Sequence, residues 1–143
     1  MRVPILERAV EVLQPTTPGK GLCFHWSAAL ALDVPDVELC IGILHENLIH
    51  AWCELGDNVY APSLIPRMGG LPAIPKSFYY IENKVRDVRR LSHSQVNSIP
   101  GIHRHLTTGK PLSNGRAVGD ILMRLAGVKW ISTPAGTAVV DES

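Results

Sequence analysis

The fold is decided by residues 37–60, which read VELCIGILHENLIHAWCELGDNVY. Residues 37–44 are a nearly continuous apolar run of strand length, which is typical of a buried central strand. The following run alternates, and successive side chains of a strand point to opposite faces. His50, Trp52 and Glu54 therefore share the polar face of a second strand, and the apolar residues between them share the other face.

A tight hairpin joins this second strand to a third strand over 58–61. The two-residue loop is either Gly56-Asp57 or Asp57-Asn58, since these residue types accept the backbone angles of such turns. In either register the cross-strand partners keep the same parity, so Ala61 and Ser63 lie on the face of His50. These are the positions from which a side chain could contact the imidazole.

Two helices are predicted ahead of the strands, over 5–13 and 22–32, with a turn-rich loop between them. Cys23 lies in the first turn of the second helix. The unpaired N–H groups and the positive end of the helix dipole favour a thiolate there, so we expect the pKa of Cys23 to be lowered. A helix-borne cysteine followed by a histidine on a strand is the order of nucleophile and base in several cysteine enzymes.

The chain after residue 61 is less regular. Prolines and glycines over 62–75 predict a crossing loop that could line a cleft, whereas 77–81 and 85–91 predict further strands. Residues 114–126 predict a helix, no element is assigned to 92–113, and a loosely ordered tail is expected from about 132 to 143. Two helices, mostly antiparallel strands and a last helix indicate an α+β fold.

The composition is that of a globular protein. A length of 143 residues fits a single domain, 45% of the residues are hydrophobic and 19% are charged. No segment resembles a signal peptide or approaches the roughly 18 apolar residues of a membrane span, so we expect a cytoplasmic protein without membrane contact. Three cysteines without paired spacing predict reduced thiols, and Cys40 and Cys53 fall on apolar strand faces as packing residues.

The charge pattern gives little support to other binding partners. Residues 1–81 hold 5 Lys/Arg against 8 Asp/Glu, and residues 82–143 hold 9 against 5, for net charges of −3 and +4. Few aromatic residues interleave with the basic ones, so a solvated basic face is the commoner explanation and nucleic-acid binding is not expected. The cysteines and histidines also lack the paired close spacings of zinc sites, and no metal is expected.

Taken together, the motifs resemble those of the transglutaminase-like group of papain-fold cysteine enzymes. In that group a helix-borne cysteine precedes a strand with His-Ala-Trp-x-Glu, a hairpin, and a strand that ends in an Asp-Pro pair. This chain has Cys23, His50-Ala51-Trp52-Cys53-Glu54, a hairpin and Val59-Tyr60-Ala61-Pro62 in the same order, over about residues 19–65. The resemblance implies one transglutaminase-like domain over residues 1–143, with a papain-like fold.

The resemblance also implies a cysteine hydrolase or acyltransferase that needs no cofactor. Cys23 would attack a peptide, amide or isopeptide bond of a peptide or protein substrate, with His50 as the base and a thioester as the intermediate. Trp52 is expected to be half core and half cleft wall. Gln14 and Thr17 are cleft candidates that could add an oxyanion donor to the backbone N–H of Cys23.

Ala61 is the departure from the family, because it stands where the aspartate of the Asp-Pro pair is expected. A carboxylate there would accept the second N–H of the histidine and steady the imidazolium. Ser63 is the favoured substitute; Glu54 shares the face but lies about 13 Å along an ideal strand, and a backbone carbonyl or a residue of the 64–76 loop could serve equally well. The alternative function is a catalytically impaired or inactive module that binds a protein or peptide partner, and an alanine introduced to disable an enzyme is a third possibility.

Overall fold

A computed structural model describes residues 2–13, 22–46, 48–61, 71–112 and 117–128, and the backbone of 130–133 and 136–139. The elements in chain order are α1 (Pro4–Leu13), α2 (Leu22–Asp33), β1 (Glu38–Leu44), β2 (Leu48–Leu55), β3 (Asn58–Tyr60), β4 (Ala73–Pro75), α4 (Lys76–Glu82), β5 (Arg86–Leu91), α5 (His93–Asn97), α6 (Ile102–Thr108), α7 (Val118–Leu125), β6 (Trp130–Thr133) and β7 (Gly136–Val139). Over these ranges, six helices accompany a small five-stranded antiparallel sheet. The predicted α+β class is confirmed.

The five strands have the order β4-β3-β2-β1-β5. β1 pairs with β2 on one side and β5 on the other, and every residue after Glu38 in it is buried, as the apolar run predicts. Leu55 pairs with Asn58, so the hairpin loop is Gly56-Asp57. Gly56 has a φ of +60°, a conformation that glycine adopts without steric cost.

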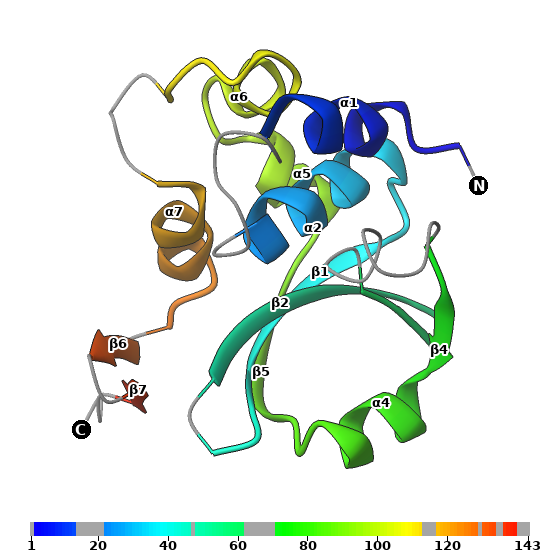
Figure 1. The fold of residues 1–143 in the computed structure, drawn as a ribbon, viewed down its shortest axis with the longest axis vertical. Coiled ribbons are helices and arrows are strands. Elements are labelled where there is room, and N and C mark those ends of the chain that lie inside the picture. Colours follow the sequence, from blue (N-terminus) through cyan, green and yellow to red (C-terminus); the bar gives the residue numbers. More distant parts are fainter. Residues whose placement is uncertain are drawn as a thin grey trace.

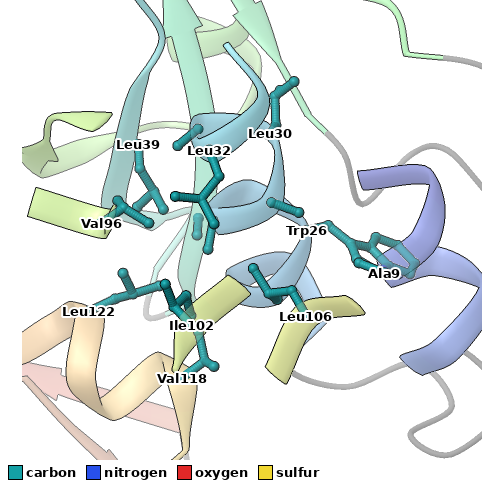
Figure 2. Close-up of a cluster of buried hydrophobic side chains, with 14 of the residues drawn as sticks. Ala9, Trp26, Leu30, Leu32, Leu39, Val96, Ile102, Leu106, Val118 and Leu122 are labelled. Carbon is teal, nitrogen blue, oxygen red and sulfur yellow. The ribbon is translucent and has the colours of Figure 1, made fainter. Parts of the chain in front are cut away.

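Helices cover the two faces of the sheet unequally (Figure 1). α2 lies on one face, with α1, α5 and α6 stacked on its far side, whereas α4 crosses the opposite face by itself. The larger core lies around α2, where side chains of α1, β1, α5, α6 and α7 converge (Figure 2). A smaller buried cluster lies between the sheet and α4; its members are Cys40, Leu44, Trp52, Val59, Ala61 and Tyr79.

A side chain at the end of α2 caps the start of α1. Oδ1 of Asp33, the last residue of α2, accepts a hydrogen bond from the N–H of Ile5, and Oδ2 accepts one from that of Leu6, both at 2.9 Å. These N–H groups belong to the first turn of α1 and have no partner within the helix. Asp33 therefore holds α1 at a fixed place on α2.

The predicted strand over 77–81 is wrong, because these residues belong to helix α4. Aromatic residues are enriched in strands, but that preference depends on what the side chains pack against. On a helix, Tyr79 and Tyr80 both reach the Trp52 ring, with ring centroids 5.6 and 6.2 Å away. Tertiary contacts with the sheet outweigh the local preference.

The remaining elements complete or extend the predicted pattern. Residues 73–75 of the predicted crossing loop form the edge strand β4, and 62–70 lie outside the described residues. Residues 92–113 contain α5, which begins with a capping box between Ser92 and Gln95, and α6. The backbone of β6 and β7 forms a hairpin within the region where a loose tail is expected, and 140–143 lie outside the described residues. None of the helices in the described part is long and apolar enough to cross a membrane.

Candidate functional site

Cys23 is the second residue of α2 and lies against β2. Its side chain is half-buried, and the backbone N–H groups of Ala51, Phe24 and Cys23 itself act to lower the pKa of its thiol. Ala51 follows His50 directly in β2. The structure therefore brings the thiol to the peptide that links His50 to Ala51.

The direction of the Ala51 N–H follows from the hydrogen-bond ladder of the β2–β3 hairpin. Leu55 and Cys53 pair with Asn58 and Tyr60, and the closing pair of a two-residue hairpin exchanges both backbone bonds, as does every second pair after it. N–H groups at 53 and 55 therefore point toward β3, and the N–H of Ala51 points the same way. β3 ends at Tyr60, and the N–H of Ala51 contributes to lowering the pKa of the Cys23 thiol. Cys23 packs against the larger core, on the α2 side of the sheet.

Burial governs the acidity of the thiol. It raises the pKa of Cys23, and the N–H groups of Ala51, Phe24 and Cys23 lower it only in part. The expectation of a lowered pKa at the helix start is wrong, because the cost of removing the thiolate from water exceeds the gain from three neutral donors. At neutral pH, Cys23 is a protonated thiol.

His50 lies on β2 opposite Gly42 and is half-buried. Burial lowers the pKa of its imidazole to about 4, so the ring is neutral at pH 7. A carboxylate in contact with the ring would favour the imidazolium and oppose this shift. The resting pair at this site is therefore a neutral thiol and a neutral imidazole.

Position 61 carries no acceptor for the imidazole. The register of the hairpin places Ala61 on the same face as His50 and Trp52, as predicted. Its side chain is buried in the cluster under α4, with Tyr79 and Val59 among the other members. Ser63, the favoured substitute, and the cleft candidates Gln14 and Thr17 lie outside the described residues.

The prediction that Trp52 forms part of a cleft wall is wrong. Its exposed fraction is 0%, and the ring packs between Gly42 on β1 and the tyrosines of α4. Its indole Nε1 donates to Oε2 of Glu54 at 2.9 Å. Trp52 is therefore the centre of the smaller core, where its one polar atom has an acceptor.

Glu54 has polar partners from β2, α4 and β5 on this face. Its exposed fraction is 2%, and each carboxylate oxygen has two partners. Oε2 accepts from Trp52 and from the Tyr80 hydroxyl at 2.5 Å, and Oε1 lies 3.3 Å from both the Lys76 ammonium and the Arg90 guanidinium. Burial raises the pKa of Glu54, but the hydrogen bonds and the two cations outweigh it, so the net pKa is lowered. Glu54 is a structural anion rather than a partner for His50.

Sequence reasoning missed the partners of Glu54 because they lie on a helix that was interpreted as a strand. Lys76 and Tyr80 are four residues apart, which places them on one side of α4. This four-residue spacing is the sequence signal that could have predicted a helix with both side chains on one face. Arg90 comes from β5, where it pairs with Cys40, and only the strand order brings it to the same side.

Tyr79 is a second residue that sequence reasoning missed. Burial raises the pKa of its hydroxyl, and negative charge on Cys23, Cys40 or Glu54 raises it further. Tyr79 therefore lies within electrostatic reach of the Cys23 sulfur from the α4 side.

The other two cysteines are packing residues. Cys40 and Cys53 have exposed fractions of 0%, and burial strongly raises the pKa of each thiol. The Cys53 thiol donates to the carbonyl oxygen of Ser27 at 3.3 Å. Neither is accessible to a reagent in the folded chain, whereas Cys23 is half-buried.

Comparisons with known proteins add no assignment. No protein-family model, curated protein or solved structure matches the chain. Among the described residues, no group of three or more His, Cys, Asp or Glu side chains could hold a metal ion.

Proposed function

We propose that the chain is a cysteine hydrolase or acyltransferase of the transglutaminase-like kind, with a papain-like fold over residues 1–143. Its substrate is a peptide, amide or isopeptide bond in a peptide or protein. The observation that supports this most is the effect of the Ala51 backbone N–H, one residue after His50, on the pKa of the Cys23 thiol at the start of α2. Free thiols at all three cysteines suit the reducing cytoplasm.

The proposed chemistry begins from the neutral pair. As the Cys23 sulfur attacks the acyl carbon, His50 takes the thiol proton, and the carbonyl oxygen becomes an oxyanion. When the intermediate collapses, the bond to the amine breaks, and the imidazolium protonates the leaving nitrogen. Water or a second amine then attacks the thioester, again with His50 as the base, and Cys23 regains its proton.

The two perturbed pKa values bear on the rate. A base with a pKa of about 4 removes a proton poorly from a thiol whose pKa is raised. The proton therefore moves only as the sulfur bonds to the substrate, rather than in a stable thiolate–imidazolium pair. We expect slow turnover with unactivated amides and faster acylation by activated esters.

An activated acyl ester with a chromogenic leaving group tests this proposal. We expect a stoichiometric burst of leaving group and an acyl adduct on Cys23, located by peptide mass spectrometry. His50→Ala should slow this acylation by about a hundredfold or more, as loss of a general base does. Cys40 and Cys53, which are fully buried, should stay unlabelled in the same sample and so report that the chain remains folded. Acylation of Cys23 at the same rate in the wild type and in His50→Ala would reject the dyad.

A second candidate is a module that kept the architecture but binds a protein or peptide partner without chemistry. The buried apolar Ala61 and the neutral resting pair favour it. Ala61→Asp separates the two, with Ala61→Asn as a control of the same size without charge. A gain in Cys23 acylation in Ala61→Asp alone would support a site that lacks only its carboxylate; no gain in a folded variant would support the binding module.

A further inference from the structure

Two histidines from distant parts of the chain meet on the side of α2 away from the sheet. His25 lies in the first turn of α2 and His105 in the middle of α6, and their ring centroids are 5.4 Å apart with planes tilted by 43°. Both side chains are half-buried. The proposed acyl chemistry does not use this pair.

His105 is oriented as metal-binding histidines are. Its Nδ1 lies 2.7 Å from the carbonyl oxygen of Lys110. A carbonyl only accepts, so Nδ1 carries the proton and Nε2 of the neutral ring is left with its lone pair. Metal-binding histidines usually donate their other N–H to a carboxylate or a backbone carbonyl, which fixes the tautomer and the ring orientation.

The separation of the rings fits a shared metal ion. A transition metal lies about 2.1 Å from an imidazole nitrogen, and hence about 3.2 Å from the ring centre, so two ligands at a tetrahedral angle place the ring centres about 5 Å apart. The observed 5.4 Å agrees with this value. Rotation about each metal–nitrogen bond changes the tilt of the planes but not the separation of their centres.

We propose that His25 and His105 form a two-histidine site for a borderline divalent transition metal such as Zn²⁺, Ni²⁺, Co²⁺ or Cu²⁺. Imidazole suits these ions, whereas Mg²⁺ and Ca²⁺ prefer oxygen ligands. Water completes the coordination, since no third His, Cys, Asp or Glu from the described residues joins the pair. The close spacings of zinc motifs fail to reveal such a site because its ligands come from two helices that only tertiary packing brings together. A bound ion would cross-link α2, which carries Cys23, to α6.

Titration of the metal-free full-length chain with NiCl₂ and with ZnCl₂ by calorimetry tests the proposal. We expect one ion per chain and a higher melting temperature with the ion bound, because the ion binds the folded state. His105→Gln, which keeps an N–H for the Lys110 carbonyl, should weaken binding by at least about tenfold. His25→Ala should do the same. His103→Ala is the matched control, since it removes an exposed histidine two residues away on α6, and it should leave the affinity unchanged.

A second measurement excludes binding by the thiol. Cys23→Ser should retain the affinity, and the Co²⁺ complex should lack the near-ultraviolet charge-transfer band of a thiolate ligand. Equal affinity in the wild type and in both His25→Ala and His105→Gln would overturn the proposal. So would loss of binding in Cys23→Ser, which would place the ion at the thiol. These readouts do not depend on whether the chain catalyses acyl transfer.

Discussion

The two faces of the five-stranded sheet are stabilised in different ways. The face toward α2 is covered by aliphatic side chains, among them Leu39, Ile41 and Leu91, which belong to the larger core. The face toward α4 is built around Trp52, and Glu54 there binds four donors from three elements. One face therefore depends on apolar area, and the other on directional bonds to a buried charge.

The polar face also shows how burial affects the charge of ionisable groups that lie on the same side of a strand. Glu54 and His50 lie on the same side of β2, where Glu54 is buried and His50 is half-buried. Donors keep Glu54 charged, whereas burial keeps His50 neutral. The donors supplied by the surroundings, and not burial alone, decide which group retains its charge.

The largest effect is expected for the apolar face, in Ile41→Ala. Ile41 has an exposed fraction of 0% and lies on β1, which has strands on both sides. Removing its side chain should cost about 3–4 kcal/mol, the transfer free energy plus that of the cavity left behind. Denaturant unfolding at pH 7 and pH 5 should give the same loss, since no charge is removed. A loss below that of Glu54→Gln would show that the polar network contributes more than the apolar core.

Glu54→Gln breaks the other face and should cost about 2–3 kcal/mol at pH 7, because two cations and two hydrogen bonds lose their ionised acceptor. The cost is below that of a fully buried pair because Lys76 and Arg90 are 36% and 40% exposed and can return to water. Glu38→Gln on β1 is the control: it removes the same charge from an exposed residue and should change stability by less than about 0.5 kcal/mol.

The stability lost in Glu54→Gln should depend on pH in one direction only. The pKa of Glu54 is lower in the folded state than its ordinary value of 4.5, so its contribution to stability is complete above that pH. It is lost as the pH falls through the folded value. The stability curves of the wild type and Glu54→Gln should therefore converge below about pH 4.5. Parallel curves down to low pH would contradict an ionised Glu54.

The apolar face is also the part of the fold that the sequence predicts best. Unbroken apolar runs and helical spacing predict β1, the β2–β3 hairpin and helices at α1 and α2, because these patterns are local. The strand interpretation of 77–81 failed because contacts of Tyr79 and Tyr80 with Trp52 decide that segment. For the same reason, the sequence places Cys23 at a helix start but does not reveal the burial that raises the pKa of its thiol. Long-range packing sets the environment of every ionisable group at the site.

Gly42→Ala probes the contact between β1 and the Trp52 ring. An added Cβ would lie 2.7 Å from Cη2 of Trp52 and 3.3 Å from the Arg86 carbonyl oxygen. The fixed indole cannot move away without breaking its bond to Glu54, so the variant should lose about 2 kcal/mol. Trp52→Phe removes the clashing atom, so the cost of Gly42→Ala should be smaller in that background. Additive losses in the double-mutant cycle would show that the clash lies elsewhere.

His50 provides the smallest effect and the sharpest contrast with Glu54. Its pKa is about 4 when folded and 6.5 ordinarily, so the unfolded chain binds the proton more readily between these values. Stability should therefore be complete above pH 6.5 and decline as the pH falls toward 4. His50→Gln should remove about 1 kcal/mol of that decline, after allowance for partial exposure of the ring. His103→Gln on α6 is the exposed control.

The pH ranges in which His50 and Glu54 change stability are different. The contribution of Glu54 is lost only below about pH 4.5, so the two effects can be separated on one stability curve. A wild-type curve that is flat between pH 6.5 and 4.5 would mean that His50 is protonated as readily in the folded chain as in the unfolded one, and the neutral resting pair at Cys23 would have to be abandoned.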